Sequence, residues 1–201
     1  MAVNENPKAP LRRQVRARRA AINPATRQVY AEQARRLAGE LPEVRRASCV
    51  FVYVSTGPEV GTRHLIADLL DAGKTVAVPV ITEAGDGVMF AAPLVSLDEL
   101  GPGRFGIPAP RDPRRLETPI DAVLAPCVAV TEDGRRLGAG GGYYDRFLAD
   151  HAAAFTAALA FEAQLVDDVP FHPHDRRVDA IVTERRVIRC GGRGGAGRFI
   201  Y

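Results

Sequence analysis

Hydrophobic positions in the first forty residues recur at the spacing of amphipathic helices. Residues 8–19 carry Leu11 and Val15 among charged positions, which predicts a helix with one apolar stripe. Asn23 followed by Pro24 is typical of an N-cap and a first helical residue. A second helix is therefore expected from this pair to about residue 40, before Pro42. Its apolar positions are Val29, Tyr30, Ala34 and Leu37.

The next segments alternate between continuous apolar runs and helical spacing. Residues 49–55 (CVFVYVS) are apolar and β-branched without alternation, as in a strand that is buried on both faces. Residues 62–71 have helical spacing and are closed by Gly73, and residues 75–81 form another apolar run. This order of strand, helix and strand predicts the βαβ unit of a parallel sheet.

The rest of the chain continues the same pattern. Strands are expected at residues 88–92, 122–130, 153–161 and 180–183, a helix at 143–150, and a surface loop at the proline- and glycine-rich residues 101–119. We therefore predict an α/β layered domain with a mostly parallel sheet and helices on both faces. One domain is expected over residues 1–190. The Gly/Arg-rich residues 191–201 cannot pack a core and are expected to be flexible.

Composition restricts the class of protein. The chain has 201 residues, of which 46% are hydrophobic, and no apolar run of about 18 residues that could span a membrane. The first residues lack the apolar core of a signal peptide. The three cysteines form no C-x-x-C pair and are odd in number, which argues against a disulfide framework, and Cys49 and Cys127 read as buried hydrophobes. A cytoplasmic protein is expected, with no membrane partner.

Positive charge is concentrated near the N-terminus. The net charge is +3, yet nine Lys/Arg and only one acid, Glu32, lie between Lys8 and Arg36. This segment could be a solvated helix face or could meet nucleic acid, a membrane surface or a polyanionic small molecule. A nucleic-acid partner is not expected, because aromatic residues make up 6% of the chain and no stacking motif is present.

The candidate chemistry is a glycine-rich run between a predicted strand and a predicted helix. Residues 136–145 read RLGAGGGYYD, so glycine backbone and a helix N-terminus could approach an anion beside Arg135 and Arg136. Asp145, one turn into the helix, could hold the magnesium of a nucleotide. The run matches neither the Walker A loop nor the dinucleotide fingerprint. The residues alone leave open a flexible hinge with Tyr143 and Tyr144 in the core.

A second polar cluster contains His172, His174 and Asp175. These residue types can bind a transition metal, but Pro173 and the absence of a fourth ligand nearby favour an ordinary loop over a zinc site.

Residues 136–148 resemble the signature of the 5-formyltetrahydrofolate cyclo-ligase family. Other elements resemble that family in the same order along residues 8–184: residues 8–12 (KAPLR), residues 51–55 with Glu59, residues 105–108 (FGIP), and residues 158–161 with Gln164, followed by 169–170 and 174–175. The resemblance implies an open Rossmann-like fold shared with sugar-phosphate isomerases and coenzyme A transferases.

The resemblance also implies a reaction. Family members use ATP and Mg²⁺ to convert 5-formyltetrahydrofolate into 5,10-methenyltetrahydrofolate, releasing ADP and phosphate through a phosphorylated N5-formyl intermediate. A monomer or weak homodimer is expected. A non-catalytic folate-binding paralogue is the alternative.

Site residues follow by matching positions. The resemblance assigns ATP to Lys8, Arg12, Arg136, Leu137, Gly138, Ala139, Gly140, Gly141, Gly142, Tyr143 and Tyr144. It assigns the folate to Val54, Glu59, Ala139, Gly140, Gly141, Gly142 and Tyr143, and the metal to Asp145 and Asp175. Some members carry basic residues in place of Ala139 and Gly141, so here that charge would come from Arg135 or Arg146, or the phosphate contacts would be made more by the backbone.

Overall fold

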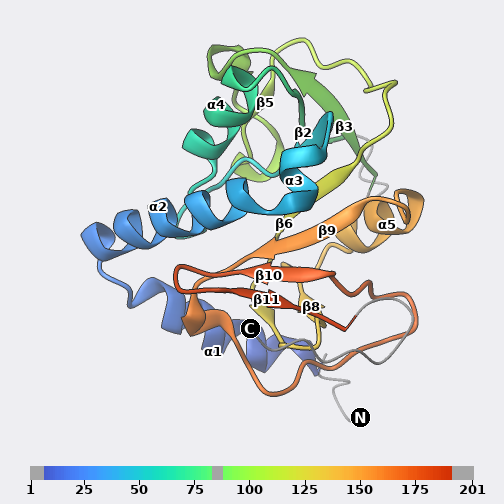
Figure 1. The fold of residues 1–201 in the computed structure, drawn as a ribbon. Helices are drawn as coiled ribbons and strands as arrows, with labels where there is room; N and C mark the ends of the chain where they lie inside the picture. The colour runs from blue at the N-terminus through green and yellow to red at the C-terminus, as the bar shows by residue number, and fades with distance from the viewer. Residues whose placement is uncertain (1–6, 83–87, 192–201) are drawn as a thin grey trace.

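The computed structural model describes residues 7–82 and 88–191, which are organised around a seven-stranded sheet (Figure 1). The order is β11-β10-β9-β6-β1-β2-β3. The five strands from β10 to β2 pair in parallel, whereas β3 and β11 are antiparallel edge strands. The bounds are β1 Cys49–Val52, β2 Thr75–Ile81, β3 Met89–Leu94, β6 Ala122–Pro126, β9 Phe155–Leu159, β10 Ala180–Val182 and β11 Val187–Arg189. The predicted α/β class with a mostly parallel sheet is confirmed.

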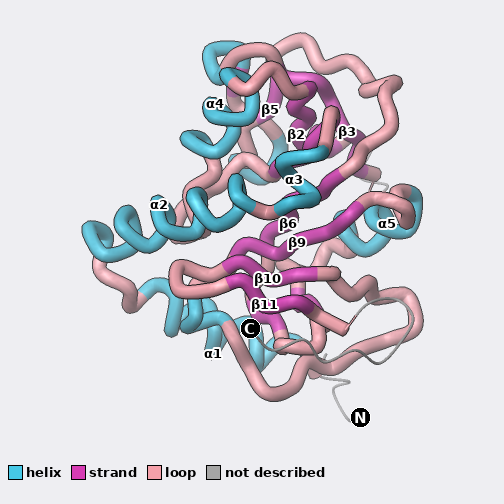
Figure 2. The backbone as a smooth tube through the Cα atoms, viewed as in Figure 1, coloured by secondary structure: helices cyan, strands magenta, loops and turns pink. Residues whose placement is uncertain are grey.

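Helices cover both faces of this sheet (Figure 2). Along β1, Val50 and Val52 belong to a core cluster that contains residues of α2, α3 and α4, whereas Cys49 and Phe51 pack with α5 on the other face. This alternation is the two-residue period of a strand, and it explains why the run is apolar throughout. The helices are α1 Lys8–Ala20, α2 Pro24–Glu40, α3 Pro42–Arg46, α4 Arg63–Asp71 and α5 Tyr143–Asp150.

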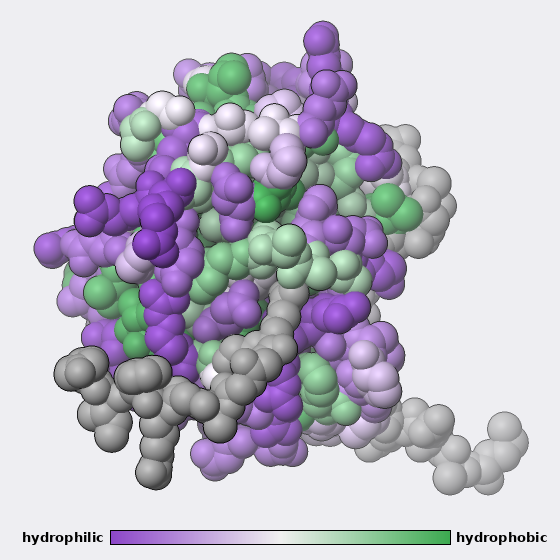
Figure 3. All heavy atoms as spheres, turned by 45° about the vertical axis from the view of Figure 1, so that its right-hand side comes forward, coloured by the Kyte–Doolittle hydropathy of each residue, from purple (hydrophilic) through white to green (hydrophobic). Residues whose placement is uncertain are grey.

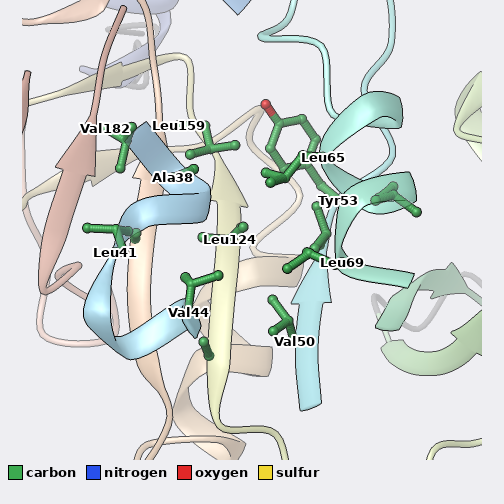
Figure 4. Packing of buried hydrophobic residues seen from close by; sticks show 14 of the residues in the cluster. Ala38, Leu41, Val44, Val50, Tyr53, Leu65, Leu69, Leu124, Leu159 and Val182 are labelled. Atoms are coloured by element: carbon green, nitrogen blue, oxygen red, sulfur yellow. The ribbon is translucent and has the colours of Figure 1, made fainter. Parts of the chain in front are cut away.

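The core on the α2 face is mainly aliphatic (Figure 4). Ala38, Leu41 and Val44 pack over Leu124 and Leu159 of the central strands, with Tyr53 at the edge of the cluster. The start of α2 has the predicted cap, because the Asn23 side chain accepts a hydrogen bond from the Ala25 N–H at 2.9 Å and proline follows it. That cap fixes where the chain turns from α1 onto the sheet.

Several predicted boundaries are wrong. The run at 122–130 divides into β6 and β7 (Ala129–Val130), and β7 pairs with β8 (Arg136–Leu137) outside the main sheet. The physical reason is Pro126, which has no N–H to continue the ladder. The run at 49–55 leaves the ladder after Val52, and the loop at 101–119 contains part of β4 (Leu100–Gly101) and all of β5 (Ala109–Pro110). The strand β11 and helix α3 were not predicted, and the predicted tail lies outside the described residues, apart from Gly191.

The face turned forward in Figure 3 is mostly hydrophilic, with hydrophobic atoms gathered toward its middle. Across residues 7–82 and 88–191, no helix is long and apolar enough to cross a membrane.

Cys49, Cys127 and Cys190 are all buried and reduced, as predicted for the first two. Burial raises the pKa of each thiol, to about 12 for Cys127 and Cys190. Because the thiolate is the reactive form, we expect Ellman's reagent at pH 8 to label negligible thiol in the folded protein and all three after denaturation. Rapid labelling of a native thiol would contradict the burial described here.

Candidate functional site

A cavity of about 900 Å³ opens where β1, β2 and β6 end. Open α/β sheets bind their ligands at the carboxyl ends of the strands, where loops diverge. The turn after β1 forms one wall, and the segment from β8 into α5 forms another. Every residue assigned to ATP, folate or metal in the sequence lines this cavity: Lys8, Arg12, Val54, Glu59, residues 136–145 and Asp175.

The glycine-rich run forms the loop between β8 and α5. Gly140 (φ 120°) and Gly142 (φ 68°) both have positive φ, which glycine adopts without the steric cost of a side chain. Gly142 is the N-cap of α5 and supplies no capping side chain. The amide groups of the first helical turn therefore lack a capping side-chain acceptor, beside a cavity that could accommodate an anion.

Arg136 is the best-buried cation of the site, with its side chain only 1% exposed. Its Nη2 donates to Asp145 Oδ1 at 3.0 Å, and its Nη1 donates to the carbonyl oxygen of Pro126 at 3.3 Å. Its guanidinium also lies over the Tyr144 ring, 5.5 Å from the ring centroid. These contacts hold one positive charge rigidly between β6, β8 and α5.

The N-terminal helix brings two more cations to the loop. Lys8 Nζ donates to Asp175 Oδ2 at 2.5 Å, and Arg12 Nε donates to the carbonyl oxygen of Gly138 at 2.9 Å. Burial raises the pKa of Asp175, but hydrogen bonds from Lys8 and from the His172 N–H outweigh it, so the net pKa is below its ordinary value. Asp175 is therefore ionised at neutral pH, as a metal-binding carboxylate must be.

The two assigned metal ligands are joined through the backbone. The N–H of Arg176, the residue after Asp175, donates to Asp145 Oδ1 at 3.3 Å. Within the described part of the chain, no group of three or more His, Cys, Asp or Glu residues could hold a metal. This donor set does not fit zinc. It fits Mg²⁺ that is bound mainly through nucleotide phosphates and water, with one or two carboxylates.

The opposite wall presents Glu59. Its Oε2 accepts hydrogen bonds from the Thr56 N–H at 2.8 Å and the Thr56 hydroxyl at 3.2 Å. Thr62 stabilises the same turn, because its hydroxyl donates to the carbonyl oxygen of Tyr53 at 2.7 Å. A carboxylate held in this way is a fixed acceptor for paired N–H donors of a ligand.

Arg146 and Arg12 lie where the loop lacks basic side chains at Ala139 and Gly141. Arg146 Nη2 donates to the Gly141 carbonyl oxygen at 2.7 Å, as expected for a nearby source of charge. The Arg12 guanidinium lies beside Gly140, because a Cβ added to this glycine would be within 3.8 Å of it. Arg135, the other suggested source, instead pairs with Asp133 and Asp168 and does not line the cavity.

Some cavity residues were not identified from the sequence as site residues. Arg176 and Thr56 also line the cavity. Their positions close to Asp175 and Glu59 in the sequence could have identified them. Pro79 and Ile81 of β2 and Met89 of β3 form an apolar wall of the cavity. In the sequence, their segments indicate only two strands. Sequence periodicity does not distinguish a strand end that faces a ligand from one that faces the core.

Comparisons with known proteins identify relatives of this chain. The profile of the 5-formyltetrahydrofolate cyclo-ligase family matches residues 4–184. The chain is 34% identical over 178 residues to 5-formyltetrahydrofolate cyclo-ligase of Escherichia coli K12, covering 86% of this chain and 98% of that protein. It is 33% identical over 191 residues to the protein of the same name from Mycolicibacterium smegmatis, covering 90% and 95%. The NMR structure of Aquifex aeolicus 5,10-methenyltetrahydrofolate synthetase superposes with a TM-score of 0.79 at 28% identity, covering 96% of this chain and 97% of that one.

Proposed function

The chain belongs to the 5-formyltetrahydrofolate cyclo-ligase family, and we propose that it converts 5-formyltetrahydrofolate into 5,10-methenyltetrahydrofolate at the expense of ATP, with Mg²⁺. The observation that carries this proposal is the single cavity that holds a carboxylate wall, a glycine loop and several cations. Its volume of about 900 Å³ is at the upper end for small-molecule sites, as two substrates require.

On this proposal, the folate lies against the turn after β1. Glu59 accepts hydrogen bonds from the pterin N–H donors, and Val54 contacts the ring from the same wall. Residues 139–143 separate the folate from the nucleotide and contact both. The apolar ends of β2 and β3 at Ile81 and Met89 would cover the rest of the ring system.

The triphosphate lies over the glycine loop. Lys8, Arg12 and Arg136 bring positive charge to it, and the amides at the start of α5 are available as donors. Mg²⁺ would be held by Asp145 and Asp175 and would neutralise charge on the phosphates. Lys8 and Arg136 are already paired with these carboxylates, so the pairs would loosen or share their partners when MgATP binds.

The proposed reaction needs no covalent intermediate with a protein side chain. The formyl oxygen attacks the γ-phosphate, and ADP departs. N10 then attacks the formyl carbon, loses its proton, and expels phosphate to close the ring. The cavity residues supply positioning and fixed positive charge where negative charge develops.

We expect purified protein with 5-formyltetrahydrofolate and MgATP to form methenyl product, measured by its near-ultraviolet absorbance, with one ADP per product. Omitting ATP or chelating Mg²⁺ should abolish product formation. Folded protein that gives no product above the enzyme-free control would remove the proposal.

The absence of basic side chains at Ala139 and Gly141 motivates a second candidate, a folate-binding protein without catalysis. It predicts calorimetric binding of 5-formyltetrahydrofolate without phosphate release. The positions of Arg12 and Arg146 beside this part of the loop favour the catalytic proposal.

A further inference from the structure

The hydroxyl of Tyr144 is buried and lacks a hydrogen-bond partner among the described residues. The ring is held in place by an edge-on contact with Phe51, whose centroid lies 6.3 Å away, and by the Arg136 guanidinium. Tyr144 also lines the cavity. The hydroxyl is therefore at a fixed position with an unused donor.

Tyr53, a second tyrosine at this cavity, provides a comparison. It is buried, lines the same cavity, and its hydroxyl donates to the carbonyl oxygen of Val60 at 2.7 Å. Buried hydroxyls are nearly always paired, because an unpaired one loses its hydrogen bonds to water without replacement. The contrast indicates that the partner of Tyr144 is supplied by a ligand.

The surroundings identify the kind of ligand group. Burial raises the pKa of Tyr144 well above its ordinary value, with Arg136 lowering it and the Glu59 carboxylate raising it. The hydroxyl therefore stays protonated, and both charged groups lie within electrostatic reach of it. Tyr144 packs against Phe51 of β1 and against the core cluster that contains Val54, so its ring lies beside the strand that leads into the proposed folate wall.

We propose that the Tyr144 hydroxyl donates a hydrogen bond to the ring carbonyl oxygen of the pterin, while Glu59 accepts from the adjacent ring N–H groups. The carbonyl and N–H groups of a 2-amino-4-oxo pyrimidine lie side by side on one edge, so one fixed donor and one fixed acceptor can bind both. This inference rests on the proposed function and changes the role of Tyr144 from nucleotide binding alone to folate recognition.

The test is Tyr144→Phe, which keeps the ring and removes only the hydroxyl. Calorimetry should show the Kd for 5-formyltetrahydrofolate rise about tenfold or more, because a buried carbonyl loses its donor. The Kd for MgATP should stay within about twofold, since the mutation removes no charge. The melting temperature should not fall, because no internal bond is lost.

Tyr53→Phe is the matched control for stability. It removes a paired hydroxyl and leaves the Val60 carbonyl oxygen without its donor, so its melting temperature should fall. A similar fall in Tyr144→Phe would show an internal role for that hydroxyl and overturn the proposal. Unchanged folate affinity, or loss of MgATP affinity alone, would also overturn it.

A second ligand locates the bond on the folate. Tetrahydrofolate has the ring carbonyl but no formyl group. Its affinity, measured under anaerobic conditions, should fall in Tyr144→Phe by the same factor as the affinity for 5-formyltetrahydrofolate. A loss confined to 5-formyltetrahydrofolate would place the hydroxyl on the formyl oxygen instead and overturn the ring assignment. These binding results do not depend on turnover, so wild-type protein that forms no methenyl product would refute the proposed function separately.

Discussion

Arg136→Met is expected to lower kcat/KM for MgATP by about a hundredfold or more. The variant removes the guanidinium that is held between the Asp145 carboxylate and the Pro126 carbonyl oxygen, and methionine preserves most of the apolar volume. The proposed reaction moves negative charge onto the phosphates in this cavity, where a fixed, desolvated cation has its largest effect.

The same substitution should also destabilise the fold. Asp145, with a side chain 18% exposed, would lose its charged partner, which costs on the order of 3 kcal/mol when the pair is buried. Denaturant unfolding and steady-state kinetics should be measured on the same preparation, so that activity is expressed per folded molecule.

Arg135→Met is the matched control for Arg136→Met. Arg135 precedes Arg136, has the same charge and forms ion pairs with Asp133 and Asp168 outside the cavity wall. Because these pairs involve exposed carboxylates, its loss should cost about 1 kcal/mol or less and leave kcat/KM close to wild type. Equal losses of activity in the two variants would refute a specific role for Arg136.

Asp145→Asn is expected to lower activity by about a hundredfold at limiting Mg²⁺, with partial recovery when Mg²⁺ is raised. Asparagine keeps an oxygen that can accept from Arg136 and from the Arg176 N–H, so the local hydrogen bonds can persist. The loss would then report the missing negative charge toward the metal and not a collapsed loop.

The measurements for Asp145→Asn are the Mg²⁺ dependence of the rate and the calorimetric Kd for 5-formyltetrahydrofolate, which should be unchanged. Asp150→Asn is the control, because Asp150 is an exposed acid at the end of the same helix and does not line the cavity. Full activity of Asp145→Asn at low Mg²⁺ would contradict the metal role.

Local sequence patterns predicted some elements closely and others poorly. The bounds of β2 and α5 agree with the prediction, because each element carries its own strand or helix pattern and its own end signals. Pro126 marks the end of β6, but the separate strand β7 was missed because it forms by pairing with β8, which is a tertiary contact. Apolar composition alone does not reveal where a chain leaves one sheet for another.

In the site, too, local sequence predicted some features, whereas others depend on contacts between distant parts of the chain. The glycine run predicted a loop before a helix, and the structure has both. The contact of Lys8 with Asp175 depends on how the whole sheet is assembled, and only family resemblance suggested that the two residues share a site. The unpaired hydroxyl of Tyr144 had no sequence signal, since tyrosine next to a glycine loop is equally compatible with core packing.

The pairing of Lys8 with Asp175 has a consequence for the order of events during protein synthesis. The two residues are 167 positions apart in the chain. While the ribosome is still translating the middle of the chain, the βαβ unit of β1, α4 and β2 is already complete in sequence, but Asp175 has not yet been synthesised. Because domains with such distant contacts fold late and slowly, the nascent chain would carry its basic N-terminal helix without the contact to Asp175 until nearly all of the domain has emerged. Assembly of the cavity wall that contains Lys8 and Asp175 would thus be one of the last steps of biosynthesis.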